Sequence, residues 1–218
     1  MSKNLIKRIL TSAVLIGLLI FFVFNNQYTW LFSLIIVSLL CWVEFINLFK
    51  KILKKNFNLR DIYIALSFGY LSLFIICSLI LYNLGFAFFI LSVCIFSDIG
   101  GYIVGNIVGG KKLTKISPNK TYSGMFGSFF LSIISANIFF TNLHYFGITG
   151  PIDISVEMFI LVILISLTSQ IGDLIISYFK RLSKVKNTGK IIPGHGGLLD
   201  RIDGMIFAFP FIYIYIYI

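Results

Sequence analysis

The sequence predicts an all-α integral membrane protein, a polytopic bundle of about seven transmembrane helices with a cytoplasmic N-terminus. Of the 218 residues, 58% are hydrophobic and only 12% are charged, whereas soluble domains contain about 25% charged residues. The apolar residues gather into seven long runs, and the basic residues gather into the connections between alternate runs. These three observations exclude a water-soluble domain, a disordered tail and a disulfide scaffold.

Each run is expected to cross the membrane once, since a crossing helix needs about 20 apolar residues. The first run, residues 9–24, follows basic residues and resembles a signal peptide, but no small-residue cleavage site comes after it. We therefore interpret it as a retained span. The remaining spans are expected at 30–49, 62–81, 86–108, 125–146, 158–179 and 202–218.

The basic residues set the predicted orientation. Seventeen of the 18 Lys and Arg residues lie on alternate connections, and Arg201 lies at the mouth of the last span on the same side. The positive-inside rule makes that side cytoplasmic. Because these cations form short clusters between apolar runs instead of covering a solvated face, nucleic acid is not expected as a partner.

Four carboxylates, Asp98, Asp173, Asp200 and Asp203, lie within apolar runs or at their ends. A charge at the bilayer centre costs about 2.5–3.5 kcal/mol, so each of them needs a partner or a purpose. Asp200 and Asp203 are three residues apart and share one helix face, whereas Asp98 and Asp173 come from two other helices. We expect all four in the cytoplasmic half of the bundle, where clustered carboxylates suit Mg²⁺ or Mn²⁺.

The alternative interpretation of these carboxylates is structural, with each charge paired to Lys180, Arg181 or Arg201. Asp173, Ser177 and Lys180 are spaced so that they form one helical stripe. Glu44, near the cytoplasmic end of the second span, is expected to be a lone interfacial residue.

The connection before the last span contains a glycine-rich segment. Gly194, Gly196 and Gly197 flank His195, and glycine backbone can direct its N–H groups at phosphate oxygens. A tight turn is the structural alternative. The nearby cations, Lys186 among them, favour a phosphate site.

Small residues and hydroxyl groups mark the fourth span and the connection after it. Gly101, Gly105 and Gly109 recur at every fourth position, which lets another helix approach closely. The connection then carries Ser117, Lys120 and Thr121. A lysine between hydroxyl groups can clamp phosphate oxygens, although a basic connector lying against lipid is the alternative.

Residues 177–203, SYFKRLSKVKNTGKIIPGHGGLLDRID, strongly resemble the signature of the phosphatidate cytidylyltransferase family, also called the CDP-diacylglycerol synthases. That signature has a Ser, a Lys-Arg pair, a Lys-Asp pair and a Pro-Gly-His-Gly-Gly stretch that closes on Asp-Arg-x-Asp. Residues 98–109, 117–124 and 170–173 also resemble family elements, so the likeness covers about 97–210. One position departs, because Lys186-Asn187 replaces the Lys-Asp pair; we assign Asn187 no metal or base role.

The resemblance implies one transmembrane catalytic domain over residues 1–218, with less characteristic helices in 1–96 and the signature in 97–218. It implies that CTP and phosphatidic acid react to give CDP-diacylglycerol and pyrophosphate, on the cytoplasmic side of a bacterial inner membrane. Mg²⁺ or Mn²⁺ is the implied cofactor. A monovalent cation and a homodimer are left open.

The resemblance also implies a division of roles within the site. Asp173, Asp200 and Asp203 would hold the metal. Asp98 would be either a further ligand or a residue that contacts and orients those ligands. The residues taken as catalytic are Lys180, Arg181, His195 and Arg201. Those taken to bind substrate are Ser117, Lys120, Thr121, Ser177, Lys186, Gly194, Gly196 and Gly197.

Two other functions compete with this interpretation. A sugar-phosphate transferase acting on polyprenyl phosphate would also use aspartates, Mg²⁺ and a basic face, but it would require a UDP-sugar in place of CTP. A transporter or channel for phosphorylated solutes would carry charges along its whole passage. The polar residues here crowd one side of the membrane, which argues against transport.

Overall fold

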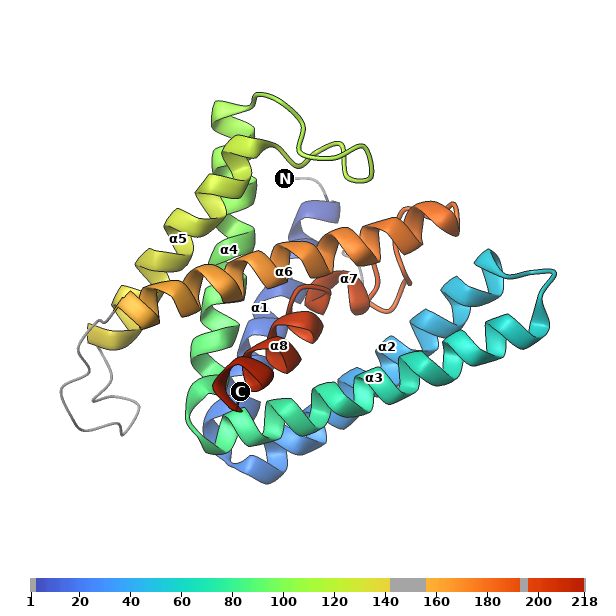
Figure 1. Ribbon diagram of the computed structural model, residues 1–218, viewed down its shortest axis with the longest axis horizontal. Helices are drawn as coiled ribbons and strands as arrows, with labels where there is room; N and C mark the ends of the chain where they lie inside the picture. The colour runs from blue at the N-terminus through green and yellow to red at the C-terminus, as the bar shows by residue number, and fades with distance from the viewer. Residues whose placement is uncertain (1–2, 142–155, 193–195, 218) are drawn as a thin grey trace.

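The computed structural model describes residues 3–141, 156–192 and 196–217, and most of these residues are helical (Figure 1). The helices are α1 (Lys3–Asn25), α2 (Gln27–Ile52), α3 (Phe57–Asn83), α4 (Phe86–Val108), α5 (Tyr122–Thr141), α6 (Val156–Leu182), α7 (Leu199–Ile202) and α8 (Met205–Tyr217). The described residues therefore confirm the predicted all-helical fold.

Five helices, α2 to α6, are long and apolar enough to cross a membrane. They contain 20 to 27 residues each, and at about 1.5 Å per residue they match or exceed a hydrocarbon core of about 30 Å. Large apolar side chains such as Leu66 and Phe130 point outward, with 63% and 62% of their surface exposed. The chain is therefore a polytopic integral membrane protein.

The predicted second to sixth spans coincide with these five helices. The fourth, α4, begins and ends at the predicted residues, Phe86 and Val108. Residues 142–146 of the predicted fifth span lie outside the described residues. The predicted first span, residues 9–24, lies within α1, which has 23 residues.

The predicted last span, 202–218, is not one long helix. The short helix α7 ends at Ile202, Asp203 and Gly204 follow, and α8 then has only 13 residues with Pro210 inside it. The first half of α8 packs inside the protein, since Ile206, Ala208 and Phe209 are at most 1% exposed, whereas Ile214 and Tyr217 further along are 49% and 58% exposed. An apolar run has the same composition whether it faces lipid or a protein core, which is why the sequence suggested a span.

Helices α4 and α5 pack closely along glycines. An added Cβ at Gly101 would lie 2.7 Å from Ser128 Oγ, and one at Gly105 would lie 3.2 Å from Thr121 Oγ1. The predicted close-packing face is therefore confirmed at these two positions. Gly109 has another role, because it caps the C-terminus of α4 with φ 63° in a region that favours glycine.

Helix α6 is at the centre of the packing between the other helices. Helix α6 runs through the centre of the molecule, with the α4–α5 pair on one side and the antiparallel α2–α3 pair on the other (Figure 1). It contacts α4, α5 and α8. The start of α2 is fixed by a capping box, in which Asn26 and Thr29 satisfy each other's backbone N–H groups.

Candidate active site

A polar cavity of about 300 Å³ lies where α4, α6, α7 and the loop 109–121 meet. All four aspartates that were expected to converge line it: Asp98 from α4, Asp173 from α6, Asp200 from α7, and Asp203. Ser117, Lys120 and Thr121 from the loop line the same cavity. The structure therefore brings together residues from four separate segments of the chain.

Lys120 ties the loop to helix α6. Its Nζ lies 2.6 Å from Asp173 Oδ2 and donates a hydrogen bond to the Gln170 carbonyl at 3.3 Å. On the other side, Ser177 Oγ donates to Asp173 Oδ1 at 3.3 Å. Both side chains of this ion pair keep about a quarter of their surface exposed, so Lys120 and Asp173 stay accessible to a ligand. Ser177 is buried, so its hydroxyl contacts Asp173 from the interior of the protein.

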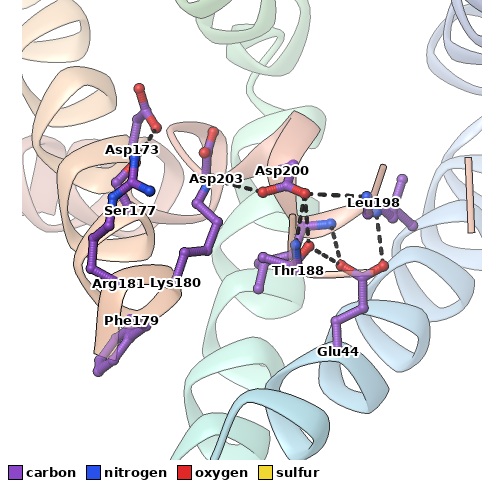
Figure 2. A network of polar contacts seen from close by, with 12 residues as sticks. Glu44, Asp173, Ser177, Phe179, Lys180, Arg181, Thr188, Leu198, Asp200 and Asp203 are labelled. Atoms are coloured by element: carbon purple, nitrogen blue, oxygen red, sulfur yellow. Dashed lines mark hydrogen bonds and ion pairs between the residues drawn. The ribbon is translucent and has the colours of Figure 1, made fainter. Parts of the chain in front are cut away.

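Asp200 holds the chain around it. Lys180 Nζ lies 2.8 Å from Asp200 Oδ1, which is one of the pairings that the structural alternative described. Asp200 Oδ2 accepts hydrogen bonds from the Thr188 backbone N–H at 2.9 Å and the Gly197 N–H at 3.1 Å (Figure 2). The Thr188 hydroxyl lies 3.1 Å from the same oxygen and can donate its single proton either to Asp200 or to Glu44. Both carboxylate oxygens therefore have partners within the protein. That Asp200 ligates a metal stays a prediction.

Glu44 is a structural anchor that sequence reasoning missed. Only 1% of it is exposed, so the expectation of a lone interfacial residue is wrong. Its carboxylate accepts hydrogen bonds from Thr188 Oγ1 at 2.5 Å, from Leu198 N at 2.9 Å and from Leu199 N at 3.0 Å (Figure 2). A Cβ on Gly197 would clash with Thr188 Oγ1 and Glu44 Oε2, so glycine is needed where the backbone closes on Glu44.

The signal for this anchor was present but incomplete. A carboxylate within an apolar span indicates a buried partner, and Thr188 lies in the family signature. However, two of the three donors to Glu44 are backbone N–H groups more than 150 residues further along the chain. Such partners carry no side-chain pattern that a sequence can show.

Gly196 and Gly197 both use their backbone N–H groups within the chain. The Gly196 N–H donates to the Ile192 carbonyl at 3.1 Å, and the Gly197 N–H donates to Asp200. Binding of substrate by these two glycines stays a prediction. Gly196 has φ 97°, a conformation that favours glycine. Gly194 and His195 lie outside the described residues, and their roles stay predictions.

The remaining predicted cations are not among the described residues that line the polar cavity. Arg181 is exposed, and its Nε donates to the Ile116 carbonyl at 3.1 Å, which links α6 to the loop. Lys186 is also exposed. Arg201 lines a different, apolar cavity. A role for these three side chains in neutralising phosphates is not tested by this geometry.

The carboxylates fit a metal only in part. Within 3–141, 156–192 and 196–217, no three His, Cys, Asp or Glu side chains are close enough together to hold a metal ion. Mg²⁺, however, is usually bound by one or two carboxylates together with substrate phosphates. Asp98 is exposed and Asp173 is half-buried at the cavity wall, so both are suitable for that kind of site.

Comparison with known proteins identifies the family. Residues 55–218 match the model of the cytidylyltransferase family, and they include every residue that lines the polar cavity. The chain belongs to the cytidylyltransferase family. The match begins well before residue 97, so it also covers helices that resembled the family only in hydropathy.

Several curated relatives of this cytidylyltransferase-family chain are named phosphatidate cytidylyltransferase. The protein of Bacillus subtilis is 37% identical over 72% of this chain and 55% of its own length. That of Staphylococcus saprophyticus is 32% identical over 97% of this chain and 82% of its own length. That of Rickettsia bellii is 40% identical over 56% of this chain and 52% of its own length. The matches thus span about half the length of two relatives and most of the third.

Proposed function

We propose that this chain transfers the cytidylyl group of CTP to phosphatidic acid, with CDP-diacylglycerol and pyrophosphate as products. The match of residues 55–218 to the cytidylyltransferase family carries this proposal, because that stretch holds the whole described wall of the polar cavity. The names of the relatives supply the lipid substrate. Family membership also favours nucleotidyl transfer over a sugar-phosphate transferase or a transporter.

The reaction requires neutralisation of charge more than it requires a strong general base. An oxygen of the phosphatidate phosphate forms a bond to the α-phosphorus of CTP. The bond from that phosphorus to the oxygen that bridges to the β-phosphate breaks, and pyrophosphate leaves. A phosphate monoester already carries a charge of about −1.5 to −2 near pH 7. The barrier is therefore the approach of two anions, which cations and positioned donors lower.

Lys120 is the residue best placed to meet a phosphate in the polar cavity. It lies at the wall beside the hydroxyl-bearing Ser117 and Thr121, and its partner Asp173 holds it in the cavity at 2.6 Å. Lys180, paired with Asp200, supplies a second positive charge nearby. We assign closure over the nucleotide to the loop around His195, in agreement with the family signature.

Mg²⁺ or Mn²⁺ is part of the proposal, and one or two of the carboxylates of Asp98, Asp173 and Asp203 would hold it. All three line the polar cavity, and substrate phosphate oxygens would complete the ligand set. When bound, such an ion neutralises charge on the α-phosphate and on the leaving pyrophosphate. The protein residues then need only hold the attacking phosphate oxygen, the α-phosphorus and the leaving oxygen in line.

We also propose that the polar cavity opens to the cytoplasm at the inner membrane of a bacterial cell, with the N-terminus on the same side. The basic connections 111–120 and 180–190 adjoin the cavity residues in sequence, and such connections favour the cytoplasmic side. CTP would reach the cavity from water, and the lipid would reach it from the bilayer.

A donor and acceptor panel tests this function. The purified protein in detergent is given CTP or a UDP-sugar as donor, and phosphatidic acid or polyprenyl phosphate as acceptor. We expect product only with CTP, phosphatidic acid and a divalent metal, and none after a chelator is added. Product with a UDP-sugar and polyprenyl phosphate, and none with CTP, would contradict the proposal and favour a sugar-phosphate transferase.

A further inference from the structure

A second cavity, of about 620 Å³, lies between α1 and α2 and reaches α7. Its volume is within the range of about 300–1,000 Å³ that is usual for ligand pockets. The described wall is apolar almost throughout, with side chains such as Leu15, Leu18 and Phe22 from α1 and Leu34 and Val37 from α2. Among the described lining residues, Arg201 is the only charged one.

Helix α7 and the residues that flank it form a wall shared by the two cavities. Asp200 and Asp203 line the polar cavity. Leu198, Arg201, Ile202 and Met205 line the apolar cavity. The second set is spaced at i, i+3, i+4 and i+7, which is one face of a helical turn. The Asp-Arg-x-Asp segment thus presents carboxylates to one cavity and a guanidinium to the other.

We propose that the apolar cavity holds an acyl chain of phosphatidic acid, with its phosphate beside Arg201 at the shared wall. This inference rests on the proposed function. An amphiphilic substrate needs an apolar volume next to a site for its anionic head, and these two cavities meet that need together. The fork of N–H donors on arginine matches phosphate oxygens.

The lining selects hydrocarbon over a water-soluble ligand. Apart from Arg201, its described polar side chains are the hydroxyl-bearing Thr11 and Ser33, and Ser33 already donates to the Trp30 carbonyl at 2.7 Å. A polar ligand buried there would lose its hydrogen bonds with water without replacing them. Val14 and Leu18 on α1 are 59% and 46% exposed, so the apolar surface continues toward the bilayer, from which a lipid chain would enter.

Photocrosslinking tests the occupant directly. The full chain in phospholipid nanodiscs is irradiated with phosphatidic acid that carries a diazirine within one acyl chain, and labelled peptides are mapped by mass spectrometry. We expect label on residues 14–22 and 30–40, and we expect unlabelled phosphatidic acid to compete it away. A phosphatidylcholine probe with the same chain should label these residues at least several-fold less. Equal labelling by both probes would mean bulk lipid fills the cavity, and label confined to other helices would also overturn the proposal.

A matched pair of substitutions on α2 gives a second readout. Val37 lines the cavity, whereas Leu39 is 49% exposed and is not among the described lining residues. Val37→Phe should raise the KM for long-chain phosphatidic acid about ten-fold, with the KM for CTP and turnover of a dihexanoyl analogue unchanged. Leu39→Phe should change none of these. If Val37→Phe fails to fold, the crosslinking result decides.

The two experiments separate this inference from the proposed function. Crosslinking does not require turnover, so specific label in a protein that makes no CDP-diacylglycerol would contradict the reaction and retain the lipid site. Turnover with no label between α1 and α2 would contradict the lipid site and retain the reaction.

Discussion

Replacing Glu44 tests whether a helix outside the family signature holds the signature loop in place. Glu44→Gln keeps the shape of the side chain but turns one acceptor oxygen into an N–H donor. Three donors meet the carboxylate in the structure, from Thr188, Leu198 and Leu199. With a glutamine, at least one of them faces another donor in a site that is only 1% exposed.

The size of the effect follows from these contacts. A buried donor left without an acceptor costs about 1–3 kcal/mol, so Glu44→Gln should weaken the closed loop by about that amount. At about 1.36 kcal/mol per factor of ten, the ratio of open to closed loop should rise roughly 5- to 160-fold, and turnover should fall as the open form gains population. Glu44→Ala leaves the Leu198 and Leu199 N–H groups without an acceptor and should cost at least about 2 kcal/mol.

Two measurements report on the loop that contains Thr188 and Lys190. Turnover is measured with CTP and phosphatidic acid, and trypsin cleavage is measured after Lys190, which is exposed in the loop that Thr188 anchors. Cleavage of a transiently opened segment tracks the population of its open form, so it should accelerate by up to that factor while the closed form still predominates. The control is Glu157→Gln, an exposed carboxylate at the start of α6, which should change neither. Wild-type turnover and cleavage in Glu44→Gln would refute the reasoning.

Two further predictions test the metal site and the helix packing. Asp203→Asn should raise the Mg²⁺ concentration for half-maximal turnover at least about ten-fold, measured by metal titration of the purified protein; near-normal turnover at low Mg²⁺ would show that Asp203 does not hold the metal. Gly127→Ala should destabilise the α4–α5 pair by about 1–3 kcal/mol, because the added Cβ would clash with Val104 and lie 2.7 Å from the Gly100 carbonyl oxygen. Gly69→Ala in α3, where nothing lies within 4 Å of an added Cβ, should unfold at or above the wild-type temperature, and equal losses in the two variants would contradict the packing argument.

The sequence predicted the five long helices because hydropathy and length constrain a membrane span strongly. It also predicted which carboxylates converge, since Asp98, Asp173, Asp200 and Asp203 each stand out against an apolar background. The last predicted span was harder. The run after Ile202 is as apolar as a span, yet the helix begins again only at Met205, and the first half of α8 is buried in the protein.

The missing parts of the site depend on tertiary contacts. Lys120 pairs with Asp173, although sequence spacing pointed to cations on the α6 stripe as partners. Glu44 contacts backbone groups of a loop that only the folded chain brings near α2. The direction of each glycine N–H likewise depends on the loop conformation, and residue type does not determine it. Composition and periodicity therefore located the site, whereas the contacts that hold it together required the structure.

The most direct test of the central claim follows the two ends of CTP separately. The purified protein is given phosphatidic acid and CTP labelled at either the α- or the γ-phosphate. We predict that the α label enters the lipid as CDP-diacylglycerol, that the γ label leaves as pyrophosphate in equal amount, and that both transfers stop without phosphatidic acid. Release of the γ label as orthophosphate, or an α label that never enters lipid in a folded protein, would contradict a cytidylyl transfer.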